Sequence, residues 1–551
     1  MKPVSVSFFL LRPLLLFGLI GCCLALSSCT VVERRIDQTV GGPIFHADTR
    51  VTMKTDDEPS RISPPLSPPS TGSLPLKLTT TDAILLALEN NRSLMVEHLN
   101  PAIQNTLEDA ERAVFDPLAT VEINGGRTDG KSQSNTGAGI RDFFEVEALG
   151  VISLEQYFPT GTSVTLEGKA ELDDYYPYLD ALYWSRLGLT VNQALLRGSG
   201  TAVNLVRLRQ ARLDTRMSEY ELRGFTQSLV AQTEETYWDY ALAKRQVEIY
   251  EESLKVARNQ LNETLALIEV GRLAKSELPA SQAELAGQEQ GLINARSKRK
   301  ITRLQFLRLL NLPGADPWER EVDLIYQSTL PNIKLDPVQV HTEMAKRSRP
   351  LINEARLKLM GDTLEVVKTK NGLLPLMDLF VSFGKSGYAD SFGRSFQNLT
   401  EDDYDAHMGV RFQYPFFNRA PKSNYRRAML NRKQAQKALD NLLQLVELDV
   451  RIAYVEVNRT REQIKASATT RRFSEETLRI ETEKLRVGQS TSLLVAQAQR
   501  DLLINRIAEV EALASYIKAL IHLYRQDGSL LERRGIVAPG RETVNLSRAT
   551  P

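Results

Sequence analysis

The residue types that most often carry catalysis or bind metals are scattered along this chain. The five histidines show no spacing typical of metal ligands; they are His46, His98, His341, His407 and His522. Gly384-Lys385-Ser386 matches only the end of a phosphate-binding loop, because Leu379 stands where the first glycine should be. Gly198-Ser199-Gly200 is more typical of a strand-to-helix hinge than of a nucleophile elbow. We therefore expect no enzymatic reaction, no cofactor and no metal site.

Composition gives no sign of a highly charged partner. The 551 residues hold 69 Lys and Arg against 68 Asp and Glu, a formal net charge of +1. No basic surplus indicates nucleic-acid binding, and we expect most charges to form solvated ion pairs on helices. With 42% apolar and 25% charged residues, the chain is long enough for several domains. After the N-terminal segment, no apolar run is long enough for a transmembrane helix.

All three cysteines, Cys22, Cys23 and Cys29, lie near the N-terminus. The apolar segment Leu14–Leu26 follows two basic residues and is too short to span a bilayer comfortably. This pattern is typical of a secretory signal, so we expect residues 1–28 to be removed. No pair of cysteines then remains for a disulfide or a thiolate metal site.

The end of this signal, Leu26-Ser27-Ser28-Cys29, resembles the lipobox of bacterial lipoproteins. The resemblance implies cleavage before Cys29 and lipidation of its thiol, and Thr30 in place of an aspartate implies sorting to the outer membrane. Acyl chains tether a protein to a bilayer without spanning it. An ordinary signal peptide cut near Ala25 and Ser27 is the alternative. Residues 29–76 carry seven prolines, six of them between Pro59 and Pro75 among Ser and Thr, which predicts an extended or disordered tether.

Two glycine joints organise the rest of the chain. Val270-Gly271 and Val487-Gly488 are 217 positions apart, and Tyr237 and Tyr454 have the same separation. Each joint lies between long proline-poor segments rich in Leu, Ala, Glu, Lys, Arg and Gln. A short glycine joint between two helices predicts a helical hairpin, and the constant spacing indicates an internal duplication.

The segments beside the joints have helical periodicity. Apolar residues before the first joint follow 4-3-4-4-3 spacing, which predicts a coiled-coil seam; they are Tyr250, Leu254, Ala257, Leu261, Leu265 and Ile268. A helix of about 70 residues is on the order of 100 Å long. Such a helix cannot bury its apolar stripe inside a compact domain, so it must lie against other long helices.

Between the helical segments the period changes to two. Residues 120–123, 164–167 and 187–192 alternate, with glycines and Pro159-Thr160-Gly161 between them. Asp378–Phe383 and Met408–Phe416 predict two more strands in the second half. The stretch 173–184 also holds five aromatic residues, which suit either a membrane-interface girdle or a packed loop cluster; they are Tyr175, Tyr176, Tyr178, Tyr183 and Trp184.

These patterns predict a mainly α fold with an internal duplication and four strands per chain. The first structural repeat spans 77–314, with a strand hairpin at about 118–195 and long helices at about 201–310. An irregular connector spans 315–334. The second repeat spans 335–532, with a strand hairpin at about 376–417 and long helices at about 422–527, and a flexible tail spans 533–551.

Four strands cannot close a barrel, since about eight is the usual minimum for a filled one. Open sheet edges are not tolerated in lipid, so strands that enter a bilayer must be shared among several chains. Three chains would give twelve strands, and their pooled helices would form a tube.

At this point the chain resembles the TolC family of outer-membrane efflux ducts, and its lipobox places it near the lipidated OprM/NodT-type branch. The matching pieces are Thr79–Leu94, Phe115-Asp116-Pro117, Tyr414-Pro415-Phe416-Phe417 and both Val-Gly joints with the helices after them. The resemblance implies a homotrimer with a 12-stranded barrel in the outer membrane and an α-helical periplasmic tunnel. It also implies a passive duct for efflux or type I secretion, with a periplasmic adaptor and an inner-membrane pump as partners.

In that family the duct narrows near the second joint, where aspartates often line the constriction. Here the matching positions hold Leu494 and Gln497, and the position after the first joint holds Glu277. An apolar and amide ring does not repel anions as a carboxylate ring does, so we expect a less cation-selective constriction with Leu494 as a steric or dewetting gate. Alternatively, Leu494 packs in the coiled-coil seam.

Two other classes of function compete with a duct. A periplasmic coiled-coil adaptor or scaffold lipoprotein without a barrel would explain the helices and the anchor, but not strand candidates at matching points of both repeats. A lipid-anchored enzyme is the weakest alternative.

Overall fold

The computed structural model describes residues 75–133, 139–176, 181–313, 316–325 and 334–546. The signal peptide 1–28, Cys29, almost all of the tether 29–76 and Tyr178 lie outside the described residues. The chain divides into two compact units. The smaller consists of residues 1–66 and Glu532–Ala538, of which only Glu532–Ala538 are described; the larger consists of Ser67–Leu531 and Pro539–Pro551. The sheets and helices below belong to the larger unit, apart from the end of α13.

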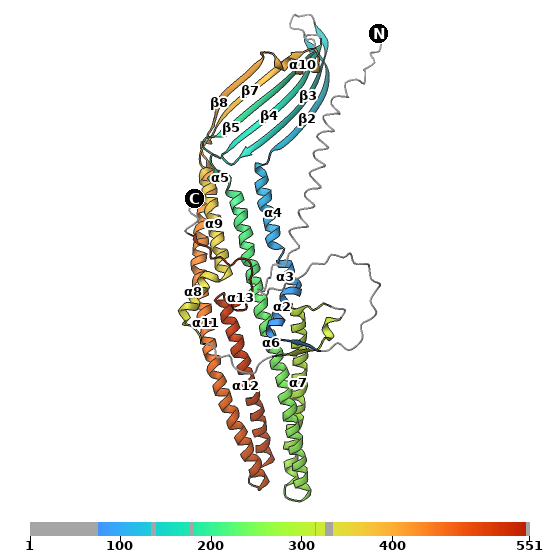
Figure 1. The fold of residues 1–551 in the computed structure, drawn as a ribbon, viewed down its shortest axis with the longest axis vertical. Coiled ribbons are helices and arrows are strands. Elements are labelled where there is room, and N and C mark those ends of the chain that lie inside the picture. The colour runs from blue at the N-terminus through green and yellow to red at the C-terminus, as the bar shows by residue number, and fades with distance from the viewer. Residues whose placement is uncertain (1–74, 134–138, 177–180, 314–315, 326–333, 547–551) are drawn as a thin grey trace, which may run out of the picture. The chain divides into compact units, whose positions relative to one another are not determined.

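One antiparallel sheet dominates the β structure of this unit. Its strands are β2 (Leu118–Gln133), β3 (Ile140–Phe158), β4 (Thr162–Tyr176), β5 (Leu182–Ala194), β7 (Leu376–Ala389) and β8 (Tyr404–Gln413), in the order β2-β3-β4-β5-β7-β8. Figure 1 shows them fanned side by side. The link between β5 and β7 joins the two halves of the chain.

The prediction of four strands per chain is therefore wrong, because the sheet contains six. The segment expected to form a single hairpin, residues 118–195, folds into four strands instead of two. This segment is longer than its counterpart in the second half, and the additional length forms two further strands. Glycines interrupt the alternation in β2 at Gly125, Gly126 and Gly130, so the sequence signal for these strands is weak. The count of twelve strands from three chains no longer follows.

The register gives the sheet two different faces. One row across all six strands is apolar throughout; it contains Ala119, Leu154, Leu166, Leu189, Phe383 and Ala406. The next row lies on the opposite face and contains only polar residues and glycine: Thr120, Ser153, Glu167, Gly188, Gly384 and Asp405. The strands thus share one apolar face and one polar face.

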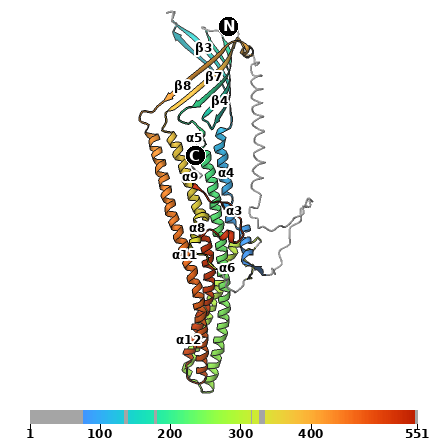
Figure 2. The same ribbon diagram turned by 60° about the vertical axis from the view of Figure 1, so that its left-hand side comes forward.

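Four long helices form two antiparallel hairpins. The first hairpin joins α6 (Val206–Glu269) to α7 (Leu278–Leu310), and the second joins α11 (Arg419–Arg486) to α12 (Ser492–Gln526). Figures 1 and 2 show the partners of each hairpin running side by side to a shared tip. Among the described residues, no helix combines the length and hydropathy that a membrane span requires.

Heptad spacing gives the long helices a buried stripe. Six buried residues in the middle of α11 follow 7-4-3-4-3 spacing, which places them on one face of the helix; they are Leu439, Val446, Val450, Ala453, Val457 and Thr460. In α6 the predicted seam is correct at Leu254 and Ala257, but its next buried position is Thr264 and not Leu265, which is 44% exposed. The Thr264 hydroxyl lies 3.2 Å from that of Ser281 on α7, so a hydrogen bond crosses the seam there.

Shorter helices pack against the long helices or, between β7 and β8, against the sheet. They are α2 (Thr80–Asn90), α3 (Arg92–Glu97), α4 (Asn100–Arg112), α5 (Thr201–Asn204), α8 (Val338–Ser348), α9 (Pro350–Asn371), α10 (Phe392–Gln397) and α13 (Leu530–Arg533). Thr79 and Asp82 form a capping box that starts α2. The apolar face of α2 then packs on a cluster that includes Tyr237, Tyr240 and Phe306.

Two predictions of irregular structure are wrong. The connector 315–334 contains β6 (Val322–Leu324), which pairs in parallel with β1 (Leu76–Leu78) at the end of the expected tether. The tail expected to be flexible from 533 to 551 is packed in its last described part, since Val544 is 5% exposed and its N–H donates to Asn353 Oδ1 over 3.1 Å. Val544 also clusters with Tyr220 and Leu357. Contacts with distant residues therefore order this part of the tail, because burial of its apolar side chains stabilises it.

Candidate functional site at the helix tips

The two helix tips have the same backbone geometry. Gly271 and Gly488 both lie in the left-handed region, with φ of 76° and 78°. The N–H of Arg272 donates to Leu267 O over 2.8 Å, and the N–H of Gln489 donates to Lys484 O over 2.8 Å. This six-to-one bond closes a Schellman motif, which favours glycine because a Cβ is strained at positive φ. The duplicated Val-Gly sequence therefore produces duplicated turns.

The second tip is capped from two directions. The Thr491 side chain accepts a hydrogen bond from the Leu494 N–H, as expected for the residue before a helix. The backbone N–H of Ser492 donates to Glu277 Oε2 over 2.8 Å. The Glu277 carboxylate thus satisfies a free N–H in the first turn of α12 and lies at the positive end of that helix dipole. Glu277 follows the first joint, so this contact links the two hairpins at their tips.

Ion pairs extend this link along the hairpins. Arg486 Nε lies 3.3 Å from Glu263 Oε1, and Arg500 Nη2 lies 3.2 Å from Glu284 Oε2, whose side chain is 5% exposed. Each pair joins the second hairpin to the first. Exposed ion pairs contribute about 0.2–1 kcal/mol each, so the stabilisation by the exposed Arg486–Glu263 pair is modest.

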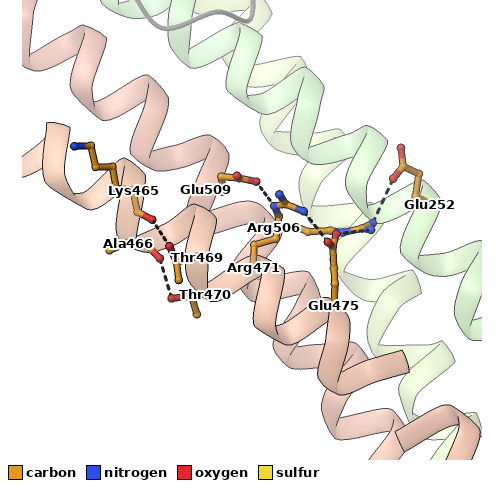
Figure 3. A network of polar contacts seen from close by, with 9 residues as sticks. All are labelled: Glu252, Lys465, Ala466, Thr469, Thr470, Arg471, Glu475, Arg506 and Glu509. Carbon is orange, nitrogen blue, oxygen red and sulfur yellow. Dashed lines mark hydrogen bonds and ion pairs between the residues drawn. The ribbon is translucent and has the colours of Figure 1, made fainter. Parts of the chain in front are cut away.

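A charged network continues the link away from the tips (Figure 3). Arg506 on α12 lies between two carboxylates: its Nη2 is 3.3 Å from Glu475 Oε1 on α11, and its Nη1 is 3.5 Å from Glu252 Oε2 on α6. Arg471 on α11 joins Glu475 over 2.8 Å and Glu509 on α12 over 2.7 Å. Burial opposes ionisation of Glu475, but its hydrogen bonds and charge contacts with Arg471 and Arg506 lower its pKa overall. Arg506 therefore connects three helices from both hairpins.

The predicted gate residues lie on the exposed side of the second tip. Leu494 is 45% exposed, and Gln497 is also exposed, whereas the intervening Val495 is fully buried and Ala496 is 5% exposed. Within one chain, Leu494 therefore does not pack in the α12 seam, so that alternative is wrong for the single chain. Glu277 follows the first joint, but its carboxylate reaches the second tip and caps α12. The structure thus brings Glu277 to the start of α12 in a capping role that the sequence did not predict.

Several residues that join the two hairpins were not predicted from the sequence. Ser492, Arg486, Arg500 and Arg506 all contact the other hairpin, and only Thr491-Ser492 after the joint carries a local signal, that of a helix start. Ion pairs between segments more than 200 residues apart leave no local pattern.

The described residues contain no group of three His, Cys, Asp or Glu side chains that could hold a metal. The buried His341 contacts Asp527, with Nδ1 2.7 Å from Oδ2. Asp527 also accepts from the Ser529 N–H over 2.8 Å. This pair joins α8 to the end of α12 and lies apart from the tips.

Comparisons with known proteins give a consistent answer. The family model described as outer membrane efflux protein matches residues 187–312 and 342–529, more than half of the chain. The comparison with curated proteins gives no match. Among solved structures, the outer-membrane channel OprN has 18% identity and a TM-score of 0.61, with 82% of this chain and 90% of that chain covered. The Campylobacter jejuni CmeC outer membrane channel has 14% identity and a TM-score of 0.61, with 85% and 88% covered.

A third solved structure, of CusC, has 17% identity and a TM-score of 0.59 and covers 82% of this chain and 92% of that chain. At these identities the structures show a shared fold. The family model covers both halves of the chain, including all of α6, α7, α11 and α12. The chain therefore belongs to the outer membrane efflux protein family.

Proposed function

We propose that this chain is the outer-membrane duct of a tripartite efflux or type I secretion system and that it exports solutes passively. The observation that carries the proposal is the two-faced sheet joined to long helical hairpins, on a chain of the efflux family. An apolar face suits lipid and a polar face suits a water-filled lumen. Channels of this family are in general not enzymes, so the energy comes from a pump.

The unpaired edges of the sheet support an assembly of several chains. Within the described residues, β2 and β8 are the two outer strands of the sheet. Open edges are not tolerated in lipid, so the β8 edge of one chain pairs with the β2 edge of the next. We propose a homotrimer, in which three sheets close one barrel and the helical hairpins form a periplasmic tunnel.

The tips are the proposed gate and the proposed contact site for a periplasmic adaptor and an inner-membrane pump. Leu494 and Gln497 face away from the chain's own core, which fits a ring that narrows the lumen in the trimer. The Glu277–Ser492 hydrogen bond and the Arg506 network hold the hairpins together and favour the closed state. An adaptor that competes for these contacts would open the duct.

The repeat boundaries and the lipid anchor belong to this proposal. Residues 77–314 and 335–532 are two copies of one plan, and Cys29 carries the acyl chains that hold the tether in the outer membrane. Lipidation adds to the membrane attachment that the sheet provides, so the chain should stay in the membrane without it.

A coiled-coil adaptor or scaffold lipoprotein without a barrel is the competing proposal, supported by the length of the hairpins. The experiment is membrane extraction of Cys29→Ser with sodium carbonate, combined with unheated gel electrophoresis in detergent. A duct stays in the membrane pellet and runs as a trimer. A scaffold held only by its lipid is washed into the supernatant.

A further inference from the structure

The two-faced pattern includes every strand of the sheet. On the apolar face, Leu154 of β3, Leu166 of β4 and Leu189 of β5 are 44–47% exposed, and Phe383 of β7 is 50% exposed. These four residues are direct cross-strand neighbours in one row. The additional strands therefore carry the same solvent-facing apolar surface as β5 and β7. Large apolar surfaces are rare on protein faces that contact water, so this row favours contact of β3 and β4 with lipid.

The apolar face of β2 ends partway along the strand. Ala119, Val121 and Ile123 are followed on this face by Gly125 and then by Arg127, which forms an exposed ion pair with Asp129 over 3.0 Å. The lower part of β2, Leu118–Gly126, has the length of a membrane strand, which is about 9–11 residues. The upper parts of β2 and β3 thus extend beyond the apolar band.

On the polar face of the sheet, side-chain contacts link β4 to β5 and β8. Arg186 of β5 makes two hydrogen bonds to Asp405 of β8, of 3.0 and 2.8 Å, and lies 3.7 Å from Glu167 of β4. This side chain crosses β7 at Gly384, where a Cβ would lie 2.6 Å from Asp405 Oδ1 and 2.7 Å from Arg186 Nε. Glycine at 384 therefore permits a charged link from β4 to β8. The additional strands are part of one continuous wall and do not form a separate flap.

We propose that all six strands of each chain form the membrane wall, so that a trimer encloses an 18-stranded exit in place of a 12-stranded one. This inference rests on the proposed function. Barrel diameter grows roughly linearly with strand number, so the exit is about 1.5 times as wide as a 12-stranded one. Barrels of about 16–18 strands leave an aqueous channel. The exit passes hydrated solutes of large cross-section, and the helix tips decide which solutes reach it.

Paired cysteine variants test whether β3 is a membrane strand. In β3, Leu154→Cys lies on the apolar face and Ser153→Cys on the polar face; in β7, Phe383→Cys and Ser382→Cys provide the reference pair. The full chain is reconstituted in liposomes and labelled with a water-soluble maleimide. Position 153 is expected to react like 382, and position 154 is expected to be protected like 383. The proposal is overturned if cysteines at 153 and 154 are labelled to the same extent while cysteines at 382 and 383 are labelled to different extents.

Pore size tests the strand number. Polyethylene glycols of graded size are added to the barrel side of the reconstituted full chain and of a variant lacking residues 134–181, which leaves β2 and β5 as one hairpin. The expected exclusion radius is about 1.5-fold larger for the parent. The same radius in both proteins, or a native mass of two chains, overturns the 18-stranded exit.

The two proposals fail differently. If the parent chain neither conducts nor forms an oligomer, the proposed duct itself is wrong. If it conducts as a trimer but β3 is labelled on both faces, only the wider exit is wrong. Should the shortened variant not fold, the labelling pairs decide, because each of them changes one side chain.

Discussion

Glu277 accepts a 2.8 Å hydrogen bond from the backbone N–H of Ser492, so the tip of the first hairpin caps the last long helix of the second. The two residues are 215 positions apart, and each follows its own glycine joint. The duplication therefore places an acceptor in one copy opposite a helix start in the other. In the proposed duct, closure of the tips would depend on this contact, which neither repeat makes alone.

Glu277→Ala is expected to open the tips. Loss of a helix cap costs about 0.5–2 kcal/mol, which corresponds to an increase of about 2- to 30-fold in the open population. Single-channel recordings in planar bilayers measure this as a higher open probability. Glu269→Ala removes an exposed carboxylate from the same tip and serves as the control. Unchanged gating in Glu277→Ala would show that the cap does not hold the tips closed.

The joint glycines are expected to be sensitive for conformational reasons. Gly271→Ala and Gly488→Ala meet no atoms within 4 Å, but their positive φ costs an L residue about 1–2 kcal/mol. Gly287→Ala is the matched control, since this glycine lies inside α7 with open space around it; alanine there is expected to stabilise the helix by about 0.5–1 kcal/mol. Backbone amide hydrogen exchange at the helix tips should be faster than in the parent for Gly271→Ala and Gly488→Ala. It should be unchanged for Gly287→Ala. Equal exchange in all three would contradict the role of φ.

The fold was predictable where local chemistry determines it. Glycine joints, proline-free stretches and heptad spacing predicted the long helices and both turns, because these signals act within a few residues. The strand count was wrong because β2 to β4 mix glycine and charged residues into their alternation, and pairing across strands decides which of them join the sheet. The packed segment around Val544 and the Glu277 cap depend on contacts with distant residues, which no local window contains.

Glu354 should make stability depend on pH. Burial, together with the nearby Glu221, raises the pKa of Glu354 from 4.5 to about 7. The folded chain therefore holds this proton more tightly than the unfolded chain. The protonated Glu354 side chain contributes its full share to the free energy of unfolding below about pH 4.5. This contribution is lost as the pH rises through about 7, and the loss is about 3 kcal/mol at most.

Glu354→Gln removes this titration. Its melting temperature is expected to differ less between pH 5 and pH 8 than that of the parent, as followed by circular dichroism in detergent. Glu343→Gln, at a carboxylate that is 60% exposed, should behave like the parent. A parent-like difference in Glu354→Gln would place the pH dependence elsewhere.

Leu494→Asp tests the proposed constriction. Three chains would add a ring of three carboxylates, and a carboxylate ring favours cations. Reversal potentials in a salt gradient should therefore shift towards greater cation preference, while Leu493→Asp reports whether the neighbouring exposed position has the same effect. No shift with Leu494→Asp would remove this residue from the lumen.

The most direct test of the duct is the conductance of the purified full chain in a planar bilayer, measured together with its native mass. The account predicts a trimer that conducts in small, infrequent steps and that opens more often when Glu277 is replaced by alanine. A monomer that shows no conductance, with or without that replacement, would contradict it.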